Sequence, residues 1–186
     1  MERTSPCHHR TCGVGDRTQR MRTILVCIAV LATACRADAS AVATVPTALA
    51  ENATMISVVD GDTIDVDIGG HRERVRLIGI DTPETKKPNT PVQCYGLEAT
   101  KFTKSLLPKD IALHLERDVV ARDDFGRMLA YVYLAGDGQF VNMTIIRQGY
   151  ARPLTIKPNA AHADEFIAAA STAQREHIGL WAKCTG

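Results

Sequence analysis

The stretch from Val58 to Thr85, V-V-D-G-D-T-I-D-V-D-I-G-G-H-R-E-R-V-R-L-I-G-I-D-T-P-E-T, contains the strongest fold signals in the chain. Two pairs of turn residues, Asp60-Gly61 and Gly69-Gly70, separate runs that are rich in β-branched residues. Asp-Gly and Gly-Gly are strong hairpin signals between such runs. We therefore predict a three-stranded meander. Its strands are Thr54–Val59, Thr63–Ile68 and Arg72–Ile80.

The third predicted strand has a mixed pattern. Val75 and Leu77 alternate with Arg74 and Arg76, but Ile78 falls on the polar side of this alternation. Successive side chains of a strand point to opposite faces, so this strand cannot be assigned two clean faces from the sequence. We take Arg76 to point toward the functional side.

The chain beyond this stretch adds two strands and three helices, which are indicated by hydrophobic periodicity and flanking turn residues. The strands are Ile111–Glu116 and Met128–Leu134. The helices are Gly96–Leu107, Asn142–Gln148, with Asn142 as its cap, and Ala160–His177. Five strands in a meander-rich order without a βαβ pattern favour an α+β, mainly β fold. We predict a five-stranded Greek-key barrel of the OB type with three helices.

The composition is that of a globular chain with one main domain. Its 186 residues are 45% hydrophobic and 23% charged, with a formal net charge of +1. Residues 1–35 hold five Lys/Arg and two Asp/Glu, so the remainder has 17 basic and 19 acidic residues. This balance excludes a general binder of polyanions. Any contact with nucleic acid must therefore be local, and a metal ion would assist it.

An apolar run of 12 residues, Thr23–Ala34, follows two arginines near the N-terminus. It is too short to span a bilayer and is typical of the core of an export signal. Leu31–Cys35 resembles a bacterial lipoprotein box, in which a lipidated Cys35 attaches the protein to the outer face of the cell membrane. Ala37-Asp38-Ala39 is instead a site for ordinary cleavage, which releases a secreted protein. Both outcomes stay open, and Met21 is an alternative start of translation.

Behind the export segment of residues 1–35 we predict a linker and one folded domain. Residues 36–52 are rich in Ala, Thr and Val with little periodicity, and the domain is expected over residues 53–186. Cys94 and Cys184 are the only cysteines beyond residue 35. An isolated pair in an exported protein favours a disulfide, which would stabilise a loop of this length by about 4–5 kcal/mol. Two unpaired thiols are the alternative.

Two acidic turns are suited to hold a hard cation. Asp62 opens the second strand and Asp81 closes the third, so antiparallel pairing would bring the two carboxylates together. Oxygen ligands suit calcium, which takes roughly six to eight of them. The alternative for Asp60-Gly61-Asp62 is an ordinary turn, and for Asp81–Glu84 a helix cap or a proline-fixed turn.

Arg76 and Arg127 are candidates for holding a phosphodiester, because guanidinium groups match phosphate oxygens and share developing negative charge. A lone arginine on a strand is usually a solvated residue. Gly126, however, would let the backbone before Arg127 approach another group closely at a turn. Glu84 is suited either to accept a proton from water or to order the water through a hydrogen bond, and the sequence leaves both roles open.

These residues belong to an ordered set that resembles the thermonuclease, or staphylococcal-nuclease-like, family. The resemblance spans about Ala53 to Trp181. Its motifs, in order, are Asp60-Gly61-Asp62-Thr63, Arg76-Leu77, Asp81–Thr85, Tyr95–Ala99, Gly126-Arg127 with Ala130-Tyr131, and Val141-Asn142 with Gly149. A single D-G-D-T motif is weak, but the whole set at near-identical spacing is highly specific.

The resemblance implies an OB-fold, calcium-dependent phosphodiesterase that cleaves DNA and RNA, preferentially single-stranded or unpaired, to 3′-phosphorylated products. The implied Ca²⁺ ligands are the carboxylates of Asp62 and Asp81 and the backbone carbonyl of Thr82. In the same way, Arg76 and Arg127 would clamp the phosphate and the transition state, and Glu84 would activate or order the attacking water. The protein is expected to act as a monomer.

The chain departs from the family's best-known member at the substrate site. Phe125 stands where that member has a tyrosine, and Pro153–Ile156 stands where it has two tyrosines, so a hydroxyl contact is lost and an aromatic platform for bases is weakened. Asp123 and Asp124 add negative charge beside the site, which should increase the dependence on calcium and ionic strength. We expect catalysis to survive and affinity and base preference to change.

Two other interpretations are alternatives to a nuclease. Non-catalytic OB modules of this family bind single-stranded nucleic acid or a protein partner, but they usually lack the acids or arginines that this chain has. A calcium-stabilised envelope lipoprotein with no role in nucleic-acid chemistry would account for the acids. It would leave Arg76 and Arg127 unexplained.

Overall fold

The computed structural model describes residues 48–86 and 91–184. The predicted export segment, Cys35 and most of the predicted linker lie outside these residues. Within the described ranges, no helix is long and apolar enough to cross a membrane.

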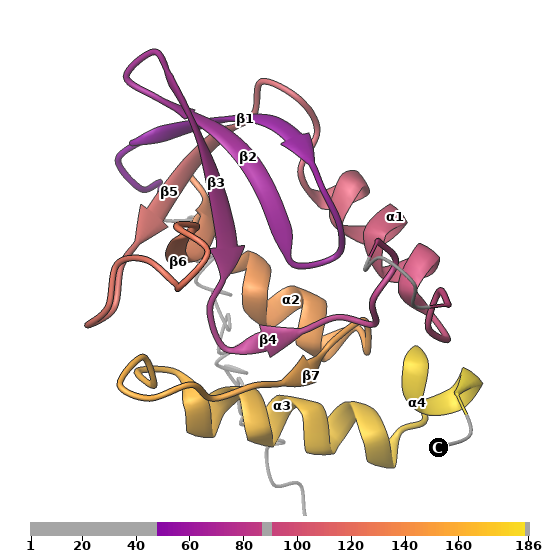
Figure 1. The fold of residues 1–186 in the computed structure, drawn as a ribbon. Helices are drawn as coiled ribbons and strands as arrows, with labels where there is room; N and C mark the ends of the chain where they lie inside the picture. Colours follow the sequence, from indigo (N-terminus) through magenta and orange to yellow (C-terminus); the bar gives the residue numbers. More distant parts are fainter. Residues whose placement is uncertain (1–47, 87–90, 185–186) are drawn as a thin grey trace, which may run out of the picture. The chain divides into compact units, whose positions relative to one another are not determined.

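A closed barrel of five strands forms the centre of the domain (Figure 1). Its strands are β1 (Ala53–Val58), β2 (Thr63–Ile68), β3 (His71–Leu77), β5 (Ala112–Glu116) and β6 (Met128–Leu134). They follow the order β1-β2-β3-β6-β5, and β5 pairs with β1 to close the barrel. Each pairing is antiparallel except that of β3 with β6, which is parallel. The predicted five-stranded barrel and its α+β class are confirmed.

Alternate side chains of the strands fill the barrel. Ile64 and Val66 of β2 and Val75 and Leu77 of β3 are at most 1% exposed. Burying each such side chain stabilises the fold by about 1.5–3 kcal/mol. Arg74, which precedes Val75 on β3, is exposed because successive side chains of a strand alternate between faces. The structure thus shows the two faces of the third strand, which the sequence left unassigned.

The third strand is shorter than predicted because a turn follows it. β3 ends at Leu77, and the chain turns at Gly79, whose φ is 80°. A positive φ favours glycine. Ile80–Asp81 then forms a separate short strand, β4, antiparallel to β7 (Arg152–Pro153). Ile78 breaks the alternation because it lies in this turn and not in the strand.

Helices flank the barrel in the described part of the chain. They are α1 (Gly96–Leu106), α2 (Val141–Arg147), α3 (Ala163–Arg175) and α4 (Leu180–Lys183). The first three were predicted, and the short α4 was not. Figure 1 shows α3 running alongside β7. Phe166 of α3 is 1% exposed and joins the core residues of the barrel, which include Tyr131 of β6.

Asn142 is not the N-cap of α2, contrary to the prediction. The helix begins at Val141, and Phe140 occupies the cap position without a side-chain hydrogen bond. The Asn142 side chain is buried instead. Its Oδ1 accepts a hydrogen bond from the Val132 N–H (2.9 Å), and its Nδ2 donates to the Ile78 carbonyl (2.8 Å). The amide thus ties the β3–β4 turn to β6 and satisfies two backbone groups away from water.

Residues before β1 already bond to the folded domain. The Leu49 N–H donates to the Ala135 carbonyl (2.8 Å). The side chain of Asn52 donates to the Leu115 carbonyl (2.9 Å) and accepts from the Leu115 N–H (2.7 Å). The hydrogen bonds of the domain therefore start within the segment predicted as a linker.

A disulfide joins Cys94, just before α1, to Cys184, just after α4. The two Cα atoms are 5.8 Å apart. The predicted cysteine pairing is confirmed. The bond ties the segment that leads into α1 to the C-terminal helix.

Candidate active site

The two acidic turns are joined through Asp62, which is 6% exposed. Its Oδ2 accepts hydrogen bonds from the backbone N–H (2.8 Å) and the hydroxyl (3.0 Å) of Thr82. Gly61 permits this approach, because a Cβ at position 61 would overlap the Thr82 side chain. The Asp-Gly-Asp segment is thus more than a hairpin connection, since it holds the second acidic turn against the barrel.

Arg76 lies between the two carboxylates that were predicted as ligands. Its Nε is 3.2 Å from Asp62 Oδ1, and its Nη2 is 3.2 Å from Asp81 Oδ1. Its Nη1 donates to the carbonyls of Leu77 and Ile80, each at 2.8 Å. The structure brings Asp62, Arg76 and Asp81 into one cluster, although Asp81 ends β4 and not the third strand.

Negative charge converges on this cluster. Burial and the charge of Asp62 raise the pKa of Asp81, against the opposing effect of Arg76. Burial and the charge of Asp62 also raise the pKa of Asp60. Carboxyl groups behave in this way when they lose water or face other acids. A bound cation would relieve the repulsion.

The donor atoms fit a hard cation such as Ca²⁺. In residues 48–86 and 91–184 there is no group of three or more His, Cys, Asp or Glu side chains suited to a metal. Asp62 and Asp81 nevertheless offer carboxylate oxygens, and Thr82 offers a carbonyl directly after Asp81. The Asp81 side chain is 56% exposed, which leaves room for water as further ligands.

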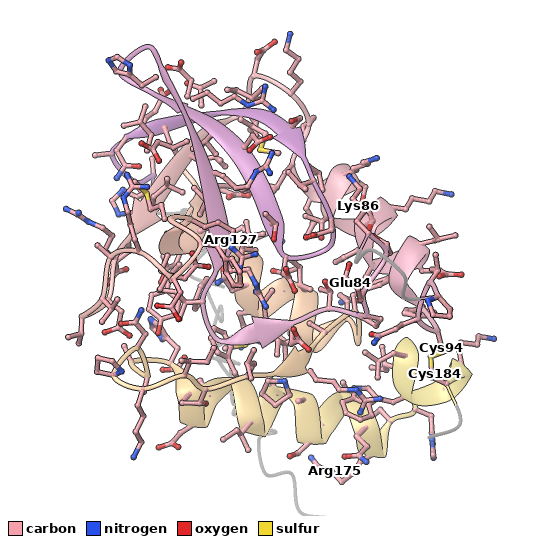
Figure 2. All side chains as sticks on the ribbon, in the orientation of Figure 1. Glu84, Lys86, Cys94, Arg127, Arg175 and Cys184 are labelled. Carbon is pink, nitrogen blue, oxygen red and sulfur yellow. A yellow bond between two sulfur atoms is a disulfide. The ribbon has the colours of Figure 1, made fainter. Side chains whose placement is uncertain are left out.

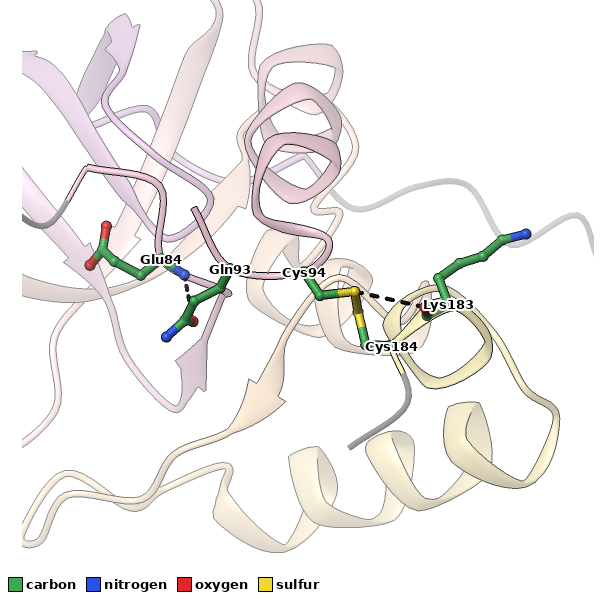
Figure 3. Close-up of a disulfide and its surroundings, with 5 residues drawn as sticks. All are labelled: Glu84, Gln93, Cys94, Lys183 and Cys184. Carbon is green, nitrogen blue, oxygen red and sulfur yellow. Dashed lines mark hydrogen bonds between the residues drawn. A yellow bond between two sulfur atoms is a disulfide. The ribbon is translucent and has the colours of Figure 1, made fainter. Parts of the chain in front are cut away.

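Glu84 is fixed through both its side chain and its backbone (Figure 2; Figure 3). Its Oε1 accepts hydrogen bonds from the N–H groups of Thr85 (2.8 Å) and Lys86 (2.7 Å). The Glu84 N–H donates to Gln93 Oε1 (2.8 Å), and the Gln93 N–H donates to the Glu84 carbonyl (2.9 Å). Gln93 precedes the disulfide residue Cys94. Sequence reasoning missed it, because a contact across a polar loop has no periodic signal.

Arg127 is held by a local turn. Asp123 Oδ1 accepts hydrogen bonds from the N–H groups of Phe125 (3.0 Å) and Arg127 (2.9 Å), and Asp123 Oδ2 accepts from Arg127 Nε (2.7 Å). Burial raises the pKa of Asp123, but the hydrogen bonds and charge of Arg127 lower it by more. Asp123 therefore positions Arg127 and balances its charge. The sequence had suggested only that it adds negative charge to the site.

The backbone at Gly126 approaches another group at this turn, as predicted, since the Gly126 carbonyl accepts a hydrogen bond from Arg122 Nη1 (2.9 Å). A glycine is not required by this approach, because among the described residues only the chain neighbours have atoms within 4 Å of the place that a Cβ would take. Glycine is favoured there by a φ of 78°. The turn leaves Phe125 85% exposed, with the guanidinium carbon of Arg127 5.5 Å from the ring centroid.

One cavity of about 400 Å³ contains both predicted arginines. Its lining includes Arg76, Arg127, Phe125, Leu154 and Ile156. Guanidinium groups beside apolar side chains suit a ligand with a phosphate and a flat ring. Among the described residues, Asp81 and Glu84 do not line this cavity, so Arg76 is the residue that links the acidic cluster to the cavity of Arg127.

Residues 74–183 match the family model described as staphylococcal nuclease homologue. The chain belongs to this family. The thermonuclease of Staphylococcus intermedius is 47% identical over 124 residues, which cover 67% of this chain and 72% of that protein. The thermonuclease of Staphylococcus hyicus is 42% identical over 127 residues, or 68% of this chain and 73% of that protein. Endonuclease YncB of Bacillus subtilis is 41% identical over 134 residues, or 71% of this chain and 62% of that protein.

Membership of the staphylococcal nuclease family confirms the resemblance seen in the sequence. It also confirms the predicted class of enzyme, a hydrolytic nuclease. The match to the family model includes Arg76, the turn Asp81–Glu84 and Arg127, whereas Asp62 precedes it. The roles of the individual residues stay predictions.

Proposed function

We propose that this protein is an exported, calcium-dependent nuclease that hydrolyses DNA and RNA, preferentially single-stranded or unpaired, and leaves 3′-phosphorylated products. One observation carries the proposal: Arg76 contacts both Asp62 and Asp81 at 3.2 Å and shares a cavity with Arg127. Acids alone would repel a polyanion, but acids that hold a cation beside two arginines suit phosphodiester chemistry. The thermonuclease and endonuclease relatives support the same activity.

In this proposal the Ca²⁺ ligands are the carboxylates of Asp62 and Asp81 and the carbonyl of Thr82. When bound, Ca²⁺ supplies polarisation of the phosphate and offsets the repulsion between the acids and the substrate. The two hydrogen bonds from Thr82 hold Asp62 in a fixed orientation. This support reduces the reorganisation that ion binding would require.

The two arginines bind the reacting phosphate in this proposal. Arg76 donates to carboxylates in the structure, so it is placed to donate to phosphate oxygens that lie beside them. Arg127 has its Nε held by Asp123, which leaves the Nη donors for the substrate. A guanidinium matches two phosphate oxygens at once. A guanidinium stabilises the transition state most, because five-coordinate phosphorus has extra negative charge.

Glu84 acts on the attacking water in this proposal. Its Oε1 is held by the N–H groups of Thr85 and Lys86, so the carboxylate keeps one position. A fixed carboxylate either accepts the proton of the water or orders the water through a hydrogen bond. Both roles stay open for Glu84.

Cleavage of denatured DNA by the full chain tests the proposal, first with excess calcium and then with excess chelator. We expect cleavage only with calcium, and mass spectrometry should identify 3′-phosphate ends. RNA is assayed in parallel. A folded sample that cleaves in neither condition would favour the alternative, a non-catalytic OB module that binds single-stranded nucleic acid or a protein partner.

We also infer export, from the sequence that precedes the described domain. The proposed organisation is an export segment over residues 1–35, a linker over 36–52 and a nuclease domain over 53–186. The Cys94–Cys184 disulfide supports an oxidising compartment. Mass spectrometry of the mature protein separates the two outcomes, since a lipidated N-terminal Cys35 indicates membrane attachment and an N-terminus after Ala39 indicates free secretion. We expect a monomer, which light scattering would test.

A further inference from the structure

A row of three arginines follows one face of β3. Arg72, Arg74 and Arg76 are alternate residues, so their side chains lie on the same face of the strand. Val75 and Leu77 on the other face are buried in the barrel. Arg76 is at the active-site end, and Arg72 is about 13 Å from it along the strand. The row therefore leads from the β2–β3 hairpin to the candidate active site.

Asp65 of β2 fixes the two outer arginines. Its Oδ2 is 2.5 Å from Arg72 Nη2 and 3.2 Å from Arg74 Nη2, and its Oδ1 accepts a hydrogen bond from Arg74 Nε at 2.9 Å. The Asp65 side chain is 3% exposed. A carboxylate with so little access to water is costly unless it is paired. Arg74 lowers the pKa of Asp65 through its hydrogen bonds, and Arg72 adds to this effect.

This cluster of Asp65, Arg72 and Arg74 has an excess of positive charge. One carboxylate is shared by two guanidinium groups, whereas Arg127 is matched one to one by Asp123. The side chains of Arg72 and Arg74 are 60% and 51% exposed. Their remaining N–H donors can therefore meet an anion from solution. A chain with little net charge thus concentrates positive charge beside its active site.

A depression of about 280 Å³ connects the cluster to the active site. It is lined by Asp65, Arg72, Arg74, Phe125, Gly126 and Arg127. Phe125 and Arg127 also line the larger cavity that contains Arg76. The two hollows share the exposed ring of Phe125 as a common edge. An exposed aromatic ring between basic groups is suited to stack an unpaired base.

We propose that Arg72 and Arg74 form a second phosphate-binding site, which holds a single-stranded nucleic acid at a phosphate beyond the reacting one. This inference rests on the proposed nuclease function, because it extends the same substrate strand past Phe125. The guanidinium groups bind phosphodiester oxygens, and the ring of Phe125 takes a base of the strand between the two hollows. A long unpaired strand thereby gains contacts that a dinucleotide lacks.

A variant without the whole ionic cluster tests this site. Asp65→Asn, Arg72→Gln and Arg74→Gln are combined, because removal of the arginines alone would leave a buried carboxylate unpaired. The triple variant loses one net positive charge. Arg175→Gln loses the same charge and is the matched control. Arg175 is exposed on α3, and Figure 2 shows it at the lower edge of the domain, whereas Arg127 is near the centre of the view.

Binding of a fluorescent single-stranded dodecathymidylate is measured by anisotropy in chelator, over a range of salt concentrations. We expect the triple variant to bind about tenfold more weakly. The slope of log K against log salt concentration should be less steep by about 1.4, or about 0.7 for each of two lost phosphate contacts. Arg175→Gln should bind like the wild type. If the triple variant and the control have the same affinity and the same salt dependence, the proposal of a second site is wrong.

Two further measurements keep the test decisive. If the triple variant does not fold, Arg72→Gln alone leaves Asp65 paired with Arg74, and it should reduce the slope by about 0.7. An unchanged slope in that variant overturns the proposal. Calcium-dependent cleavage is assayed separately. If the wild type cleaves DNA but the variant binds as tightly as the wild type, only the proposal of the second site is refuted. If the variant binds more weakly but the wild type does not cleave, only the proposed nuclease activity is refuted.

Discussion

The two sides of the candidate active site are built differently. The acidic side, Asp62 with the turn Asp81–Glu84, is held by contacts between distant parts of the chain, such as that of Asp62 with Thr82, 20 residues away. The arginine side is the turn Asp123–Arg127, and its main contact spans four residues. Changes on the acidic side should therefore affect stability and function together. Changes on the arginine side should affect function with little effect on stability.

The covalent structure sharpens this difference. Gln93 exchanges two hydrogen bonds with Glu84, and the next residue, Cys94, is linked to Cys184 (Figure 3). The acidic side is thus fastened through the disulfide to the last helix of the domain.

Removal of the disulfide should have the largest effect on stability. In the double variant Cys94→Ser/Cys184→Ser, the free energy of unfolding should fall by about 4–5 kcal/mol, because the unfolded chain is no longer constrained. Urea unfolding measures it. Turnover should fall as well, since Gln93 would hold Glu84 less firmly. An unchanged free energy of unfolding would show that the acidic side does not depend on this bond.

Arg127→Ala should reduce kcat by about 10²–10³-fold, because it removes a donor to the charge that develops on the phosphate. The free energy of unfolding should change by less than about 1 kcal/mol, as the turn keeps its backbone hydrogen bonds to Asp123. Arg147→Ala, at an exposed position of α2, is the control. Glu84→Ala should also lower turnover by orders of magnitude. Near-normal turnover in either variant would refute its assigned role.

Asp62→Ala and Asp123→Ala compare the two sides directly. Asp62→Ala should cost about 2–3 kcal/mol of stability, because it leaves the Thr82 N–H without its acceptor in a buried place. Asp123→Ala should cost about 1 kcal/mol, because its partners are more exposed. Calcium titration should show weaker binding only for Asp62→Ala. Unchanged calcium affinity in that variant would mean that another carboxylate is the ligand.

Gln93→Ala should have the smallest effect. Loss of the acceptor for the Glu84 N–H should lower kcat by about three- to tenfold, because the lost hydrogen bond is exposed. KM and calcium affinity should stay as in the wild type, since Gln93 contacts neither substrate nor ion in the proposal. Gln139→Ala, on the loop before α2, is the control. A change in KM with constant kcat would contradict a positioning role.

Strands whose hydrophobic runs are bounded by turn residues were predicted correctly from the sequence. β2 and β6 have the predicted bounds, because turn residues delimit their apolar runs. The third strand was predicted to be too long, because Ile78 and Ile80 are residue types that favour strands. The turn that separates β3 from β4 depends on the positive φ of Gly79, which the sequence pattern does not reveal. The two-residue strands β4 and β7 are too short for any alternation to show.

The candidate site was predicted less completely than the barrel. The acids and arginines follow from ordered motifs, but their supports do not. Asp123 holds Arg127 by a side-chain contact within a turn, and Gln93 holds Glu84 across a polar loop. Asn142 was assigned to a cap, although its amide bridges two buried backbone groups. Such contacts depend on the folded arrangement and leave no spacing rule in the sequence.

The closure of the barrel has a further consequence for the lifetime of the folded protein. The pairing of β5 with β1 completes the ring of hydrogen bonds, so the barrel strands do not present an open sheet edge to other chains. Open edges are templates for intermolecular pairing and aggregation. The ring of paired strands therefore protects the barrel from self-association by edge pairing, without help from the flanking helices.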